Sequence, residues 1–140
     1  MYFIHKLKSV LLGLAFSLTF TVNLVMAKEE EPGTVVLTFD DSVASQATFV
    51  APLLKEHGFG ATFFITEGFD FAKDKKNYMT WEQIKEVESN DFVYIGHHSH
   101  THEYLIDGSN EDFILDIKKA NKIFLKELGY VPSLFSYPFG

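Results

Sequence analysis

The stretch that decides the fold is TVVLTFDD, residues 34–41, in which an apolar run ends in two carboxylates. A second stretch, FVYIGHHSHTH at residues 92–102, ends an apolar run in imidazoles instead. Both runs are short and rich in β-branched and aromatic residues, which predicts strands. Carboxylates and imidazoles at strand ends are what a divalent metal with an open, water-binding position requires. The two stretches therefore predict a metal-dependent hydrolase.

Two further apolar runs have the same character as these strands. The four predicted strands are Thr34–Phe39, Ala61–Thr66, Phe92–His97 and Ser133–Tyr137. All four are nearly continuous in apolar residues, which is typical of a sheet covered on both faces.

Three helices are predicted between the strands from apolar spacing and cap residues. The first runs over about Ser45–His57 with Ser45 as its N-cap, and a glycine follows it. The second begins at Thr80, where Thr80 and Gln83 form a capping box, and the third covers about Asn110–Leu128. The expected buried positions are Phe49, Val50, Leu53 and Leu54 in the first, Trp81, Ile84 and Val87 in the second, and Phe113, Ile117, Ala120, Phe124 and Leu128 in the third.

This order of elements, βαβαβαβ, predicts an α/β fold with a parallel sheet and right-handed crossovers. Alternation alone does not separate an open doubly wound sheet from part of a (β/α) barrel. Both architectures place functional groups at the carboxyl ends of the strands. Asp40-Asp41, His97–His102 and Pro138–Gly140 all fall at that edge.

The first 27 residues predict a targeting segment rather than part of the fold. A short basic region precedes an apolar run over about residues 10–25, and small side chains near Ala27 suit a signal peptidase. Polar residues within the run favour cleavage over a permanent anchor, although an uncleaved N-terminal membrane anchor remains the alternative. Residues 28–33 then form a linker and 34–140 the domain. Both alternatives predict an extracytoplasmic protein.

The amino-acid composition limits which partners the protein can bind and which side chains can serve as metal ligands. The chain has 140 residues, 46% of them hydrophobic, which is enough for one core. Its net charge of −7 offers no basic patch for nucleic acid or for an anionic membrane surface, and no protein partner is inferred. Cysteine and arginine are both absent, so metal ligands must come from histidine and carboxylate side chains.

Each polar cluster also has a structural interpretation. An Asp pair after a strand often caps the next helix, because carboxylates satisfy free N–H groups and complement the helix dipole. Four histidines within residues 97–102 are harder to explain in that way. His98 and His102 are spaced i, i+4, which would bring both to one side of a helical turn and suits two ligands of one metal.

Taken together, the motifs resemble those of a known enzyme family. The run Thr38–Asp41, the His98-Ser99-x-x-His102 run after Ile95-Gly96, and the turn Tyr137–Gly140 resemble the first three motifs of the polysaccharide deacetylases. These are the NodB-homology domains of carbohydrate esterase family 4. Ala61–Ile65 resembles the second strand of that family, and the resemblance covers about residues 34–140. It implies the N-terminal portion of a distorted (β/α) barrel.

The resemblance implies a role for each motif residue. Asp41, His98 and His102 correspond to the ligands of a divalent metal, most often zinc, with cobalt, manganese or nickel as alternatives. Asp40 corresponds to the general base, and the backbone N–H of Phe139 to a donor that stabilises the oxyanion. The implied reaction hydrolyses N-acetyl groups of an N-acetylglucosamine polysaccharide outside the cytoplasmic membrane.

Other positions near these motifs are expected to play lesser roles. Ser99 is expected to shape the loop through a local hydrogen bond, His97 to support the ligands without binding metal, and His100 to be solvated. Ser136 stands where the family often has an arginine that orients the base.

No counterpart of the family's later motifs follows Gly140, so we expect a partial domain with an incomplete site and an open edge at Ser133–Tyr137. Two alternatives to a deacetylase remain at this stage. One is a noncatalytic carbohydrate- or metal-binding remnant of the same fold. The other is an open flavodoxin-like binding domain with an incidental histidine loop.

Overall fold

The computed structural model describes residues 33–68 and 75–140. The predicted targeting segment, residues 1–27, and all of the linker except Gly33 lie outside the described residues. Residue contacts divide the chain into two units, 1–34 and 35–140, and the second contains every element discussed below. Within the described ranges, no helix is both long enough and apolar enough to cross a membrane.

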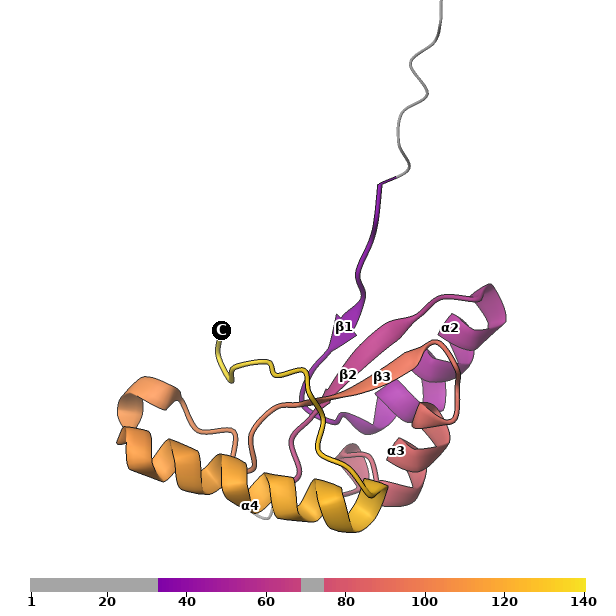
Figure 1. Cartoon of the computed structure of the whole chain (residues 1–140). Coiled ribbons are helices and arrows are strands. Elements are labelled where there is room, and N and C mark those ends of the chain that lie inside the picture. Colours follow the sequence, from indigo (N-terminus) through magenta and orange to yellow (C-terminus); the bar gives the residue numbers. More distant parts are fainter. Residues whose placement is uncertain (1–32, 69–74) are drawn as a thin grey trace, which may run out of the picture. The chain divides into compact units, whose positions relative to one another are not determined.

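The described sheet has three parallel strands in the order β1-β2-β3 (Figure 1). Strand β1 covers Thr38–Phe39, β2 covers Ala61–Ile65 and β3 covers Val93–His97. Thr38 pairs with Thr62, and Ile65 pairs with His97 at the other end of the ladder. The predicted α/β class is therefore confirmed, and the carboxyl ends of the strands lie side by side.

Two predicted strands are shorter in the structure than in the sequence analysis. Val35 and Val36 precede β1 and are 81% and 76% exposed, so the first strand reduces to two residues. Ser133–Tyr137 forms only an isolated parallel bridge between Phe135 and His97. Its backbone contributes the Leu134 carbonyl, which accepts from His97 N–H, and the Ser136 N–H, which donates to the His97 carbonyl. The prolines at 132 and 138 lack the N–H that would extend this pairing.

The helices match the predictions most closely in the second half of the chain. Helix α3 covers Trp81–Glu88 and begins with the predicted capping box of Thr80 and Gln83. Helix α4 covers Asn110–Leu128, begins at the N-cap Ser109 and ends at Gly129, whose φ of 83° is the left-handed value that glycine adopts readily. Short 3₁₀ turns cover Lys75–Asn77 (η3) and Leu105–Asp107 (η4).

The first helix differs from its prediction. It opens with a π-helical segment, η1, over Gln46–Val50 and continues as α2 over Ala51–His57. The wider i→i+5 turn moves the buried face, so Phe49 and Leu53 are exposed while Gln46 and Ala51 are buried. The predicted N-cap, Ser45, makes no cap hydrogen bond, because its own backbone is already helical.

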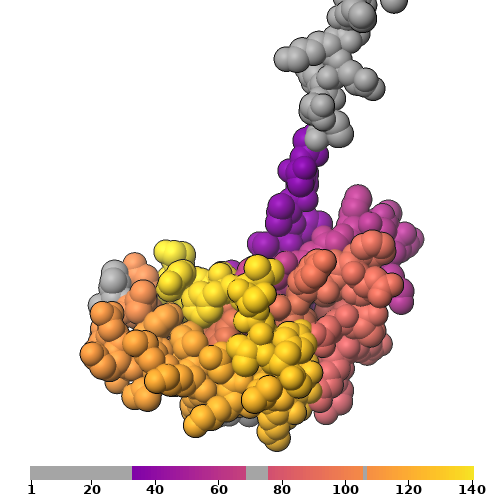
Figure 2. Space-filling view, viewed as in Figure 1, coloured from indigo at the N-terminus to yellow at the C-terminus, as the bar shows by residue number. Residues whose placement is uncertain are grey.

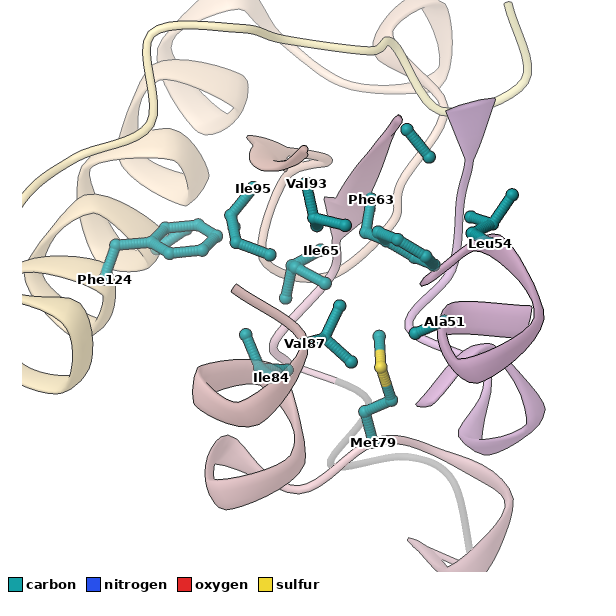
Figure 3. Packing of buried hydrophobic residues seen from close by; sticks show 12 residues of the cluster. Ala51, Leu54, Phe63, Ile65, Met79, Ile84, Val87, Val93, Ile95 and Phe124 are labelled. Carbon is teal, nitrogen blue, oxygen red and sulfur yellow. The ribbon is translucent and has the colours of Figure 1, made fainter. Parts of the chain in front are cut away.

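Helices α2, α3 and α4 pack against one face of the sheet (Figures 1 and 3). That face presents Phe63 and Ile65 of β2 and Val93 and Ile95 of β3, all at most 6% exposed. The expectation of two covered faces fails within the described residues, because Tyr94 on the opposite face is 64% exposed. On the surface seen in Figure 2, the C-terminal segment lies against α4. The ring of Phe113 stacks on that of Tyr137, with centroids 6.1 Å apart.

Phe124 is the position at which α4 is most strongly tied to the core. Its side chain is fully buried and its ring lies edge-on to Trp81, with centroids 5.7 Å apart. We expect Phe124→Ala to lower the free energy of unfolding by about 3–5 kcal/mol, because it removes a large ring and leaves a cavity. Denaturant unfolding followed by circular dichroism measures the change.

The neighbouring Leu125 is 57% exposed and provides the matched control. Leu125→Ala should change the free energy of unfolding by less than about 0.5 kcal/mol. Equal effects of the two substitutions would contradict the packing described for α4.

Candidate metal centre

A buried hydrogen-bond chain joins the carboxyl ends of the three strands. The Ser42 hydroxyl donates to the Thr66 carbonyl at 3.0 Å and accepts from the Thr66 N–H at 2.9 Å. The Thr66 hydroxyl in turn donates to the His98 carbonyl at 3.0 Å. Ser42, Thr66 and His98 belong to the segments that directly follow β1, β2 and β3. Their hydrogen bonds therefore fix the distances between the three segments that carry the candidate site.

The two carboxylates after β1 are aimed by an unusual backbone. Asp41 and Ser42 have φ values of 71° and 55°, in the left-handed region that non-glycine residues rarely adopt. The buried side-chain amide of Gln46 donates to the Asp40 carbonyl and thereby holds the turn. The Asp pair therefore forms a turn after β1. It does not cap the next helix, because that helix begins further along the chain.

The histidine loop, residues 98–102, brings His98 and His102 together, but not through the helical turn that their i, i+4 spacing predicted. Residues 98–102 are not helical, and Ser99 and His102 have φ values of 66° and 57°. The Ser99 hydroxyl accepts the His102 N–H at 3.0 Å, which is the local hydrogen bond expected of Ser99. A tight loop, and not a helical turn, therefore brings His98 and His102 together, with ring centroids 4.9 Å apart.

Asp41, His98 and His102 form one cluster. Asp41 Oδ1 lies 3.3 Å from His98 Nε2 and 3.0 Å from His102 Nε2. One ligand atom from each residue lies within 4.8 Å of the other two, which is the size of a cation site. The His98 side chain is 3% exposed and that of His102 is 18% exposed, so solvent reaches the cluster from one side.

The hydrogen bond of His98 Nδ1 shows which ring nitrogen is left to bind a cation. Its Nδ1 lies 2.8 Å from the Ser136 carbonyl, which can only accept a hydrogen bond, so Nδ1 carries the proton. In the neutral ring, Nε2 is then a bare lone pair that faces the buried Asp41 Oδ1 at 3.3 Å. Among the described residues, that oxygen has no assigned hydrogen-bond donor. Two acceptors aimed at one point are what a divalent cation would bring together, so the donor set fits such an ion.

Asp40 lies beside the cluster without joining it. Its Oδ2 is 4.0 Å from His98 Nε2, and its side chain is 44% exposed. The Ser136 hydroxyl donates to this carboxylate at a long 3.3 Å. Ser136 therefore contacts Asp40 with its side chain and His98 with its carbonyl, at the position where the sequence lacks an arginine.

Phe139 lies at the rim of the cluster. Its φ is 64°, and a hydrogen bond from Gly140 N–H to the Tyr137 carbonyl closes the turn that contains it. Its ring lies edge-on to His102 with centroids 4.8 Å apart. Among the described residues, no acceptor pairs with the Phe139 N–H.

His97 is buried and lies outside the cluster of Asp41, His98 and His102. Its ring packs between Phe124 and Phe135, with centroids 5.1 and 5.2 Å away. Burial lowers the pKa of His97 below its usual value, so the ring is neutral at pH 7. Its Nδ1 then accepts the Ser99 N–H at 3.0 Å and supports the loop between the two other histidines.

The expectation of a solvated His100 is wrong. The residue is 2% exposed, and its Nδ1 lies 3.2 Å from Glu67 Oε2, because the loop turns this side chain toward the end of β2. Glu67 is also approached by Trp81 Nε1 at 3.4 Å.

The sequence analysis overlooked two carboxylates that contact this loop: Glu67, which lies beside the His100 ring, and Asp116, which accepts the N–H groups of His100 and Thr101. Glu67 directly follows a predicted strand, so the strand-end rule that singled out Asp40 and Asp41 could have found it. Asp116 interrupts the apolar stripe of α4 between Phe113 and Ala120, and a charged residue at such a position is a signal of a buried partner.

Comparison with known proteins gives a consistent result. The family described as polysaccharide deacetylase matches residues 27–140. Over 104 residues the chain is 26% identical to a peptidoglycan-N-acetylglucosamine deacetylase of Bacillus cereus, an alignment that covers 74% of this chain and 35% of that protein.

The structure is also similar to solved structures of deacetylases. The Streptococcus pyogenes deacetylase PplD in complex with acetate aligns with a TM-score of 0.68 and 25% identity over 81% of this chain and 50% of that one. IcaB from Ammonifex degensii aligns with a TM-score of 0.68 and 29% identity over 79% of this chain and 52% of that one. The chain thus spans about half the length of these two structures.

Gly68 provides a test of how the loop is supported. Its N–H donates to the His100 carbonyl at 2.8 Å, and a Cβ at this position would lie 2.5 Å from that carbonyl oxygen and from the His100 ring. We expect Gly68→Ala to lower the free energy of unfolding by about 1–3 kcal/mol, because backbone and ring must both shift. Denaturant unfolding measures this.

Gly108 is the control, since a Cβ there would meet no atom of the described residues within 4 Å, and its φ of −118° suits any residue. Gly108→Ala should leave stability within about 0.5 kcal/mol of the parent or raise it slightly. A harmless Gly68→Ala would show that the loop does not approach Gly68 as closely as described.

Proposed function

Because the chain belongs to the polysaccharide deacetylase family, which matches residues 27–140, we propose that it forms the metal-binding half of a deacetylase. The substrate would be an N-acetylglucosamine-containing polysaccharide outside the cytoplasmic membrane, and the bond hydrolysed a carbon–nitrogen amide bond. The observation that carries this proposal is the convergence of Asp41 Oδ1 with the Nε2 atoms of His98 and His102.

In this proposal Asp41, His98 and His102 hold one divalent cation, with zinc favoured by two imidazoles and one carboxylate. Such an ion, when bound, supplies a Lewis acid that polarises the acetyl carbonyl and lowers the pKa of water. Cobalt, manganese and nickel can use the same ligands. The Ser136 carbonyl supports the set by keeping the His98 proton on Nδ1.

Asp40 is the proposed general base. Its carboxylate is beside the cluster but outside it, and is accessible enough to accept a proton from the attacking water. The Phe139 N–H is the proposed donor to the oxyanion, since it lies at the rim with no acceptor among the described residues. Asp40 would move the proton while Phe139 stabilises the developing charge.

The relatives support the substrate class. One is a peptidoglycan-N-acetylglucosamine deacetylase, and another was solved with acetate, the acid that deacetylation releases. The proposed extracytoplasmic location is supported by the kind of polymer that these relatives act on and by the apolar run near the N-terminus. A noncatalytic binding protein of this fold is the alternative, and it predicts metal uptake without acetate release.

The first test of the proposal concerns metal content. Purified protein should contain about one divalent ion per chain by elemental analysis. The double variant His98→Ala, His102→Ala should lose it, because one carboxylate alone cannot retain the ion.

His57→Ala is the control, since His57 ends α2 and belongs to no metal-sized cluster of the described residues. It should keep the ion. Retention of the metal by the double variant would refute the assigned ligands.

A second test separates base from ligand in the adjacent carboxylates. In a full-length version that also carries the family's later motifs, Asp40→Asn should keep the metal and reduce acetate release from N-acetylglucosamine oligomers by roughly a hundredfold or more, as expected for a lost base. Asp41→Asn should lose both metal and activity. If the two variants lost metal equally, the roles assigned to Asp40 and Asp41 would be wrong.

A further inference from the structure

The carboxylate of Asp116 on α4 receives three hydrogen bonds from the loop between His98 and His102. Asp116 Oδ2 accepts the His100 N–H at 2.7 Å, and Oδ1 accepts the Thr101 N–H at 3.0 Å and the Thr101 hydroxyl at 2.8 Å. Hydrogen bonds to a charged acceptor are the stronger kind, and two successive N–H groups that point to one side form an anion-binding concavity. A helix residue thus holds the middle of the loop.

The loop requires such support because its backbone is unfavourable. Ser99 and His102 are both left-handed, and each such non-glycine residue persists only where its surroundings impose it. Asp116 acts on the two residues between them. The loop's own hydrogen bond, from His102 N–H to the Ser99 hydroxyl, does not involve the amides of His100 and Thr101, and Asp116 supplies the acceptor for both.

The two histidines depend on this support unequally. His98 is also held by strand contacts, through its N–H to the Ile65 carbonyl at 3.0 Å and its carbonyl to the Thr66 hydroxyl. The backbone of His102 is tied instead to Ser99 within the loop. Release of the loop centre would therefore displace His102 more than His98.

We propose that Asp116 is a positioning residue that holds the histidine loop, and above all His102, in ligand geometry before any metal binds. This inference rests on the proposed function for the identity of the ligands. It predicts that α4, which contributes no ligand of its own, determines the affinity of the site.

The experiment compares Asp116→Ala with Glu111→Ala, an exposed acidic residue on the same helix. Zinc affinity is measured by chelator competition, and amide hydrogen exchange of His100 and Thr101 is measured by NMR in the metal-free protein. Asp116→Ala should weaken zinc binding by about 10–100-fold, the usual effect of losing a group that orients a ligand. Exchange at the two amides should accelerate by about tenfold or more. Glu111→Ala should change neither.

Two milder variants protect the test if Asp116→Ala does not fold. Asp116→Asn keeps an acceptor for Thr101 but turns an N–H₂ group toward His100 N–H, and Thr101→Val removes only the hydroxyl bond. Asp116→Asn and Thr101→Val should both weaken zinc binding less than Asp116→Ala does. Asp116→Asn should also accelerate amide hydrogen exchange at His100.

Unchanged zinc affinity and unchanged exchange in Asp116→Ala would overturn the inference. So would a loss of global stability with zinc affinity intact, since that marks a purely structural residue. If the parent protein takes up none of zinc, cobalt, manganese and nickel, the proposed function fails, while the exchange data on metal-free protein still decide whether Asp116 holds the loop.

Discussion

The site depends on the hydrogen-bond chain from Ser42 through Thr66 to His98. Strand β1 has only two residues in the ladder, too few to fix where its carboxyl end lies relative to β3. The two hydroxyls do this instead, by bonding backbone groups of the neighbouring strand end. All of these groups are buried, so a broken link would leave unsatisfied polar atoms, each worth about 1–3 kcal/mol. The spacing of the candidate ligands is therefore set with little freedom.

Backbone strain is concentrated at the same place. Five non-glycine residues of the described chain have positive φ, and all five lie in or beside the cluster: Asp41, Ser42, Ser99, His102 and Phe139. Such conformations are unfavourable by about 1–3 kcal/mol each and persist only where several contacts impose them. Gln46, Asp116 and the turn before Gly140 supply those contacts from three different segments. The strain is consistent with a backbone shaped for side-chain placement rather than for stability.

Prediction from sequence succeeded where the signal is local. Helix α4 has its predicted bounds because apolar periodicity, an N-terminal cap and a final glycine all act within a few residues. The capping box of α3 is of the same kind. The first helix occupies its predicted range and buries Leu54 as expected, but Phe49 and Leu53 are exposed because a π-helical turn shifts the buried face, and local propensity does not predict such a turn. The outer strands are shorter than predicted, because a strand exists only where a neighbour pairs with its backbone groups.

By itself, the sequence determined the chemical types at the strand ends, the α/β order and the family to which the motifs belong. Asp40, Asp41, His98 and His102 could be nominated because residues after parallel strands meet at one edge. The resemblance had already grouped Asp41 with the histidines and set Asp40 apart, and the tertiary structure added the distances, with Asp41 Oδ1 3.0 to 3.3 Å from the two Nε2 atoms and Asp40 Oδ2 4.0 Å from His98 Nε2. Only the tertiary structure decided how the two loops are held. It also decided that His100 is buried against Glu67 and that Asp116 holds the loop. Those outcomes depend on hydrogen bonds between residues far apart in the chain, whose partners no local pattern specifies.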